Sequence, residues 1–139
     1  MTEYEAVNAA LLSVLDGVGG AAVERNADLA LAIPDAGHVV ILDGEIIDED
    51  RTLGRDGVRF VRQGNTIEIY VAGRWRSETM DTLVRAVRDA IDADPTLGGV
   101  VHHCELRRDE AGQQTTEGGD TIAVTLLTAI SEYQTTSSV

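Results

Sequence analysis

Apolar residues recur at helical spacing in two segments of the chain. The first segment begins after Thr2, which is spaced from Glu5 as in a capping box, and ends at Gly19-Gly20. The second follows Ser77, a suitable N-cap, and ends before Asp94-Pro95, because proline disfavours helical backbone in the residue before it. These patterns predict helices over about residues 3–18 and 78–93.

Short β-branched and apolar runs predict strands in the rest of the chain. Residues 38–42 form one such run, and Asp43-Gly44 behind it is a candidate hairpin turn with residues 45–47 starting the return. Residues 58–62 and 66–72 predict a hairpin whose turn is Gln63-Gly64-Asn65. Within its second strand, Ile67, Ile69 and Val71 share one face and Glu68 and Tyr70 the other. Further strands are expected over residues 22–25, 29–33, 100–108 and 120–131.

Polar, glycine-containing stretches predict loops over residues 48–57 and 109–119. The resulting order of elements predicts an α+β fold, in which a mixed, mainly antiparallel sheet has two helices packed on one face. Its length of 139 residues suits a single domain, expected over residues 1–133, with a flexible C-terminal tail at 134–139.

Charge is the strongest compositional signal. The chain has 24 acidic residues and 11 basic ones, all of them arginine, and a net charge of -13. Such a surface repels phosphate backbones, which argues against tight binding of nucleic acid. Cys104 is the single cysteine, so no internal disulfide can form, and neither a signal peptide nor a membrane span is expected. We therefore expect synthesis in a cytoplasm.

No group of residues has the spacing of a catalytic, metal or cofactor site. Asp48-Glu49-Asp50 lacks the ladder of a calcium loop, and in His102-His103-Cys104 strand geometry lets only the first and third residues converge. The glycine pairs lack the context of a phosphate-binding loop. We expect no catalysis, no metal and no cofactor.

The order of parts resembles a known family. An N-terminal helix leads to the strand at residues 38–42, a long loop and a hairpin. The second helix then closes on residues 92–101, DADPTLGGVV, and a final strand pair ends at residues 122–130. This arrangement is similar to the tail terminator (tail-completion) proteins of long-tailed bacteriophages and gene transfer agents, over about residues 1–133.

The resemblance implies a role in assembly. Terminators of this type form a hexameric ring that stops growth of the tail tube and joins it to the connector, or stopper, of the head. The implied partners are other copies of the chain, the tail tube protein and the connector, and the implied location is the head–tail interface of a virion made in a bacterial cytoplasm. DNA would pass through the ring without specific binding, and an acidic channel would repel its phosphates.

The two predicted loops are the candidate assembly interfaces, because long polar loops often order against a partner. Their candidate residues are Asp48, Glu49, Asp50, Arg51, Arg55, Arg59, Gln113, Gln114 and Glu117. The arginines either pair with acidic neighbours in the ring or remain on a solvated surface. Alternatives to the terminator are another neck or head–tail connector component, a small dimeric ligand-binding module and, ranked lowest, a small hydrolase.

Overall fold

The two predicted helices are present in the computed structural model, which describes residues 2–27, 33, 35–51, 59–72, 78–115 and 121–135. Helix α1 (Glu3–Leu15) begins where expected, and the hydroxyl of its N-cap Thr2 accepts a hydrogen bond from the Glu5 amide at 3.1 Å. It ends earlier than predicted, because Gly17 adopts a left-handed conformation before the short 3₁₀ helix η1 (Val18–Gly20). Helix α2 spans Glu78–Ala93, as predicted.

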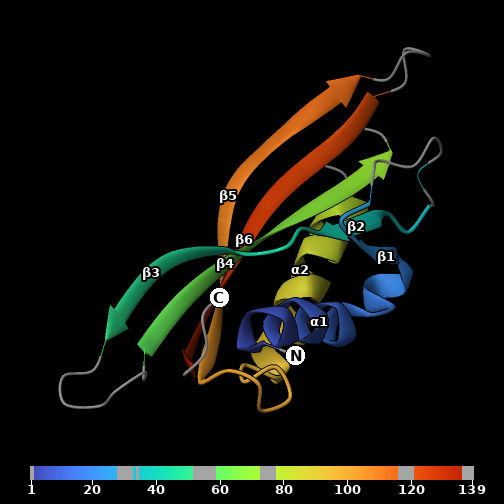
Figure 1. Ribbon diagram of the computed structural model, residues 1–139. Coiled ribbons are helices and arrows are strands. Elements are labelled where there is room, and N and C mark those ends of the chain that lie inside the picture. The colour runs from blue at the N-terminus through green and yellow to red at the C-terminus, as the bar shows by residue number, and fades with distance from the viewer. Residues whose placement is uncertain are drawn as a thin grey trace.

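In the described part of the chain, six strands form one sheet with the order β1-β2-β4-β6-β5, and β3 also pairs with β4 (Figure 1). Among these strands only β1 and β2 are parallel, which confirms the expected α+β class with a mainly antiparallel sheet. The strands are β1 (Ala22–Arg25), β2 (His38–Ile41), β3 (Glu45–Arg51), β4 (Arg59–Ala72), β5 (His103–Thr115) and β6 (Thr121–Thr135).

The predicted hairpin around Gln63-Gly64-Asn65 is wrong, because these residues lie inside the continuous 14-residue strand β4. The composition is that of a turn, but the side chains of Gln63 and Asn65 are buried in hydrogen bonds on the helix side of the sheet. Strand β4 pairs with β6 along its whole length, so β2 and β3 both occupy its other edge, one after the other. Residues 42–44 are therefore a break between two collinear strands, and the predicted turn at Asp43-Gly44 is also wrong.

Several strands extend into segments predicted to be loops. Strand β3 includes residues 48–51 and β5 includes residues 109–115, since pairing with a neighbouring strand satisfies the backbone of a polar segment as well as that of an apolar one. Strand β5 starts at His103, later than predicted, and β6 continues beyond residue 131 to Thr135. The rest of both predicted loops and residues 136–139 lie outside the described residues, as does most of the expected strand at 29–33.

Both helices cover the same face of the sheet, as expected, and the main core lies between them (Figure 1). The predicted alternation in β4 is confirmed: Ile67, Ile69 and Val71 face the helices, while Tyr70 faces the opposite side in a smaller cluster with Val40 and Ile122. The largest fully buried apolar side chains of the main core are Leu11, Leu15, Ile41, Ile67, Ile69, Met80, Ile91, Leu97 and Leu127.

Candidate assembly site on the arm of the sheet

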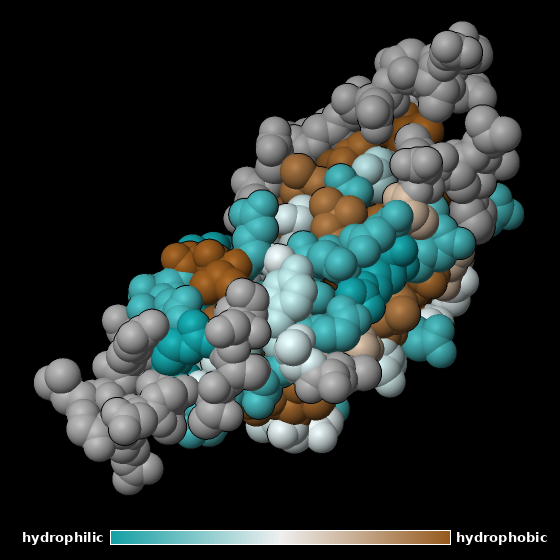
Figure 2. Space-filling view, in the orientation of Figure 1, coloured by the Kyte–Doolittle hydropathy of each residue, from teal (hydrophilic) through white to brown (hydrophobic). Residues whose placement is uncertain are grey.

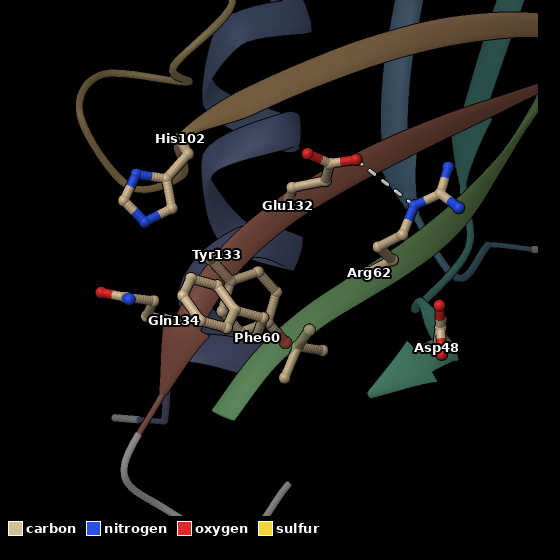
Figure 3. Close-up of a pocket in the computed structure, with 8 residues that line it drawn as sticks. Asp48, Phe60, Arg62, His102, Glu132, Tyr133 and Gln134 are labelled. Carbon is tan, nitrogen blue, oxygen red and sulfur yellow. Dashed lines mark ion pairs between the residues drawn. The ribbon is translucent and has the colours of Figure 1, made fainter. Parts of the chain in front are cut away.

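One end of the sheet extends beyond the two helices (Figure 1). We call this part, formed by β3 and residues 59–64 of β4, the arm. A cleft of about 480 Å³ opens where the arm meets the end of β6 (Figure 3). Its lining residues are Asp48, Phe60, Val61, Arg62, His102, Glu132, Tyr133 and Gln134.

The charged centre of the cleft is Arg62. It stands opposite Glu132 on β6 and opposite Asp48 on β3 in the strand register. Its Nε lies 3.4 Å from a carboxylate oxygen of Glu132, and the two side chains point toward each other in Figure 3. Among the residues that the structure describes, this Nε is buried and makes no hydrogen bond. The two side chains are 40% and 53% exposed overall, and an exposed pair of this kind adds little stability.

Exposed apolar side chains flank this pair. Ile47 is 53% exposed and Phe60 is 47% exposed, and they are the large apolar side chains left exposed in the described part of the chain. Ile47 lies over Gly64, where an added Cβ would come within 2.7 Å of its Cδ1. Figure 2 shows hydrophobic surface as a brown area over β3. Exposed apolar side chains beside an arginine are typical of a contact between proteins, in which aromatic residues and arginine are enriched.

The structure places the predicted interface residues differently from the sequence analysis. Asp48, Glu49, Asp50 and Arg51 belong to strand β3 and do not form a loop. Glu49 forms an ion pair with Arg59, so both charges have a partner within the chain. Gln113 and Gln114 lie in β5, opposite Ala123 and Ile122. Arg55 and Glu117 lie outside the described residues.

Among the predicted residues whose side chains the structure describes, only Asp48 lines the cleft, and sequence reasoning missed Phe60, Arg62, His102 and Glu132. The overlooked signal is the alternation of side chains along β4 when residues 59–72 are taken as one strand. Phe60 and Arg62 are two residues apart and so share a face, and Gly64 two residues further makes room for Ile47. The predicted hairpin hid this alternation.

A buried polar network lies under the root of the arm. Asn8 of α1 uses its Oδ1 to accept hydrogen bonds from Gln63 Nε2 at 3.0 Å and from Asn65 Nδ2 at 2.7 Å. Tyr133 donates its hydroxyl to Gln63 Oε1 at 2.7 Å, and burial raises the pKa of Tyr133 to about 12, so it remains protonated as a donor at neutral pH. The amide of Gly44 donates to the same oxygen of Asn8 at 3.0 Å. Satisfied in this way, the network ties α1, β4, β6 and the 42–44 break together.

An ion-pair cluster adjoins the network. Arg25 of β1 donates to Asp43 through Nε at 2.6 Å and to Glu5 of α1 through Nη1 at 2.9 Å. These hydrogen bonds lower the pKa of both carboxyl groups and raise that of the guanidinium. At the other end of the arm's root, the Thr135 hydroxyl donates to a Glu3 carboxylate oxygen at 2.8 Å, joining the end of β6 to the start of α1.

The structure does not bring together His102 and Cys104, the two residues of the His102-His103-Cys104 cluster that strand geometry allowed to converge, because β5 starts only at His103. Cys104 is buried on the helix side, where burial raises the pKa of its thiol, while His102 and His103 are exposed. Among the described residues, no group of three His, Cys, Asp or Glu side chains is placed to hold a metal ion. Within the same residues, no helix is long and apolar enough to cross a membrane.

Comparison with known proteins gives little beyond this geometry. No family model matches the chain, and no curated protein matches it in sequence. Among solved structures, a chain from the "Virion of native gene transfer agent (GTA) particle" is similar, with a TM-score of 0.47 and 17% sequence identity. The alignment covers 94% of this chain and 91% of that chain. A similarity at this level does not assign a function to the present chain.

Proposed function

We propose that this protein is a structural part of a phage-like particle, and specifically a tail terminator that forms a ring at the head-proximal end of the tail tube. The observation that carries the proposal is the arm, which extends beyond the helix layer. It exposes Phe60 and Ile47 near an open cleft, whose lining includes Phe60 and Arg62. A surface of this kind suits protein–protein contact. The order of elements resembles that of the tail terminator family, and this resemblance supports an assembly role for the contact.

A cyclic ring of more than two copies requires one surface of each copy to bind a different surface of the next, because a contact between two identical surfaces closes at a dimer. The arm is a suitable first surface because it extends away from the body of the protein. In a ring of acidic chains, the central channel would repel DNA phosphates and allow DNA to pass without binding. The other partners would be the tail tube protein and the head connector, at the head–tail interface of the virion.

The most direct test is assembly of the particle without this protein. Deletion of its gene should leave filled heads separate from over-long or headless tails in electron micrographs. Restoring the gene should restore normal particles. Normal particles in the deletion strain would refute the proposal.

A second test addresses the arm. The double variant Ile47→Ser, Phe60→Ser should lose complementation of the deletion while remaining folded, because both side chains are about half exposed. A matched control is Thr79→Ser, Thr82→Ser on the exposed surface of α2, which should complement normally. Full complementation by the arm variant would show that the arm is not the assembly surface.

The cleft also favours a second candidate function, a small ligand-binding module. Its volume of about 480 Å³ is in the range of small-molecule sites, and Arg62 contributes a positive charge to the lining that would attract an anionic group. A screen of small carboxylates by thermal shift would test this candidate. A shift that Arg62→Met abolishes would favour it over the terminator.

A further inference from the structure

Residues 42–44 interrupt the strand pairing along the edge of β4 that β2 and β3 share, and side chains replace the missing strand partners. The Leu42 amide still donates to the Thr66 carbonyl at 2.9 Å. Beyond that point, the Leu42 carbonyl accepts from Asn65 Nδ2 at 3.0 Å, and the Asp43 amide donates to Asn26 Oδ1 at 2.9 Å. The break is therefore held by specific contacts and is not a loose linker.

Helix α1 supplies the contacts at the last residue of the break. The Gly44 amide donates to Asn8 Oδ1 at 3.0 Å, and the Gly44 carbonyl accepts from the Tyr4 hydroxyl at 2.7 Å. Tyr4 and Asn8 are four residues apart and so lie on the same face of α1. Gly44 itself leaves no room for a side chain, since an added Cβ would come within 2.5 Å of Gln63 Nε2.

Strand β3, which begins directly after this residue, contacts the main core through the partly buried Ile46, while Ile47 is exposed. In the described part of the sheet it pairs on one side only, with β4, and its register shifts between Ile46 and Asp48. Among the described residues, its side-chain ion pair is that between Glu49 and Arg59. Edge segments with few buried contacts open locally at a lower free energy than the core.

From this arrangement we infer that Tyr4 and Asn8 of α1 form a latch that holds the root of β3 at Gly44. With the latch closed, β3 covers the edge of β4 over residues 59–64 and keeps the cleft in shape. With the latch open, β3 separates from that edge while the rest of the sheet remains folded. A partner that moves the first turns of α1 would thereby change the arm, which couples two surfaces through a two-state element.

The competing explanation is that these hydrogen bonds only add to global stability. The two explanations differ in which strands exchange their amide hydrogens faster when a contact is removed. If the contacts form a latch, removing one should lower the protection of β3 amides against hydrogen exchange and leave the other strands unchanged. If the contacts only add to global stability, protection should fall equally in every strand whose amides exchange only by global unfolding.

Hydrogen–deuterium exchange of the full chain, followed by mass spectrometry, separates them. Tyr4→Phe removes one hydroxyl that donates to Gly44 and should raise exchange in peptides covering residues 45–51 by about threefold to tenfold, the range expected for one hydrogen bond. Asn8→Ala should raise it further. Peptides from residues 121–131 of β6 should exchange as in the unmodified protein.

Ser13→Ala is the matched control, because Ser13 lies exposed on the same helix and makes no latch contact. It should leave exchange at residues 45–51 unchanged. If Asn8→Ala fails to fold, Tyr4→Phe decides the question alone, since it removes a single oxygen. Equal acceleration in β3 and β6, or no acceleration in residues 45–51 of folded Tyr4→Phe, would overturn the latch.

Discussion

The two glycines at the root of the arm should respond very differently to the same substitution. An added Cβ at Gly44 would meet Gln63 Nε2 at 2.5 Å and Asn65 Oδ1 at 2.7 Å. An added Cβ at Gly64 would meet Ile47 Cδ1 at 2.7 Å. The distances are similar, but the neighbours are not: the first are buried amides fixed by hydrogen bonds, and the second is the end of an exposed, flexible side chain.

For Gly44→Ala, overpacking costs about 1–3 kcal/mol, and one displaced amide left unpaired in the core costs about 1–3 kcal/mol more. We expect the free energy of unfolding to fall by about 3 kcal/mol. For Gly64→Ala, Ile47 can rotate into solvent, and the loss of backbone freedom in the unfolded chain contributes about 0.4–1 kcal/mol in favour of folding. The net change should stay within about 1 kcal/mol.

Equilibrium unfolding in urea is the assay. With a denaturant slope of about 2 kcal/mol per molar, Gly44→Ala should lower the midpoint by about 1.5 M, and its melting temperature should fall by about 10 °C. Gly64→Ala should have a midpoint close to that of the unmodified protein. Equal destabilisation by the two substitutions, or a larger effect at Gly64, would refute the reasoning that the rigidity of the neighbour decides the outcome.

Three further predictions concern buried and paired groups. Tyr133→Phe should lower the free energy of unfolding by about 1–3 kcal/mol in urea, because Gln63 Oε1 loses its donor in the core. At pH 7, Arg25→Met should melt at a lower temperature than the unmodified protein, and this difference should shrink as pH falls below about 4. Arg25 lowers the pKa of Asp43, and the stabilisation is lost once Asp43 is protonated. A constant difference down to pH 2 would contradict this prediction. Cys104 should react with a thiol reagent only after unfolding, since it is buried and its pKa is raised, and rapid labelling of the folded protein would disprove its placement.

The fold could be predicted where the spacing of nearby apolar residues determines the structure. It could not be predicted where contacts between residues far apart in the sequence determine it. The helix at residues 78–93 was predicted correctly because its apolar stripe and flanking residues are local signals. The segment Gln63-Gly64-Asn65 was misread because its strand conformation depends on partners far along the chain. Gln63 bonds to Asn8, 55 residues away, and to Tyr133, 70 residues away. Tertiary contacts of this kind override the local preference for a turn.

The candidate site was predictable to a smaller extent. The acidic segment that contains Asp48 was predicted to be part of an assembly surface, and the structure places this residue beside the cleft. Arg62 and Glu132 lie on different strands, 70 residues apart, and only the pairing of β4 with β6 makes them neighbours. A single sequence carries no signal of that register, so neither residue could be proposed for the site.

The hydrogen bond between Thr135 and Glu3 has a practical consequence for protein engineering. Residues near the beginning and near the end of the chain touch, at the side of the molecule where the arm starts. A short linker could therefore join these two segments in a circular permutant, with new ends opened elsewhere. A purification tag fused at residue 135 would stand next to the arm, so a detachable tag is the sound choice for measurements of self-association.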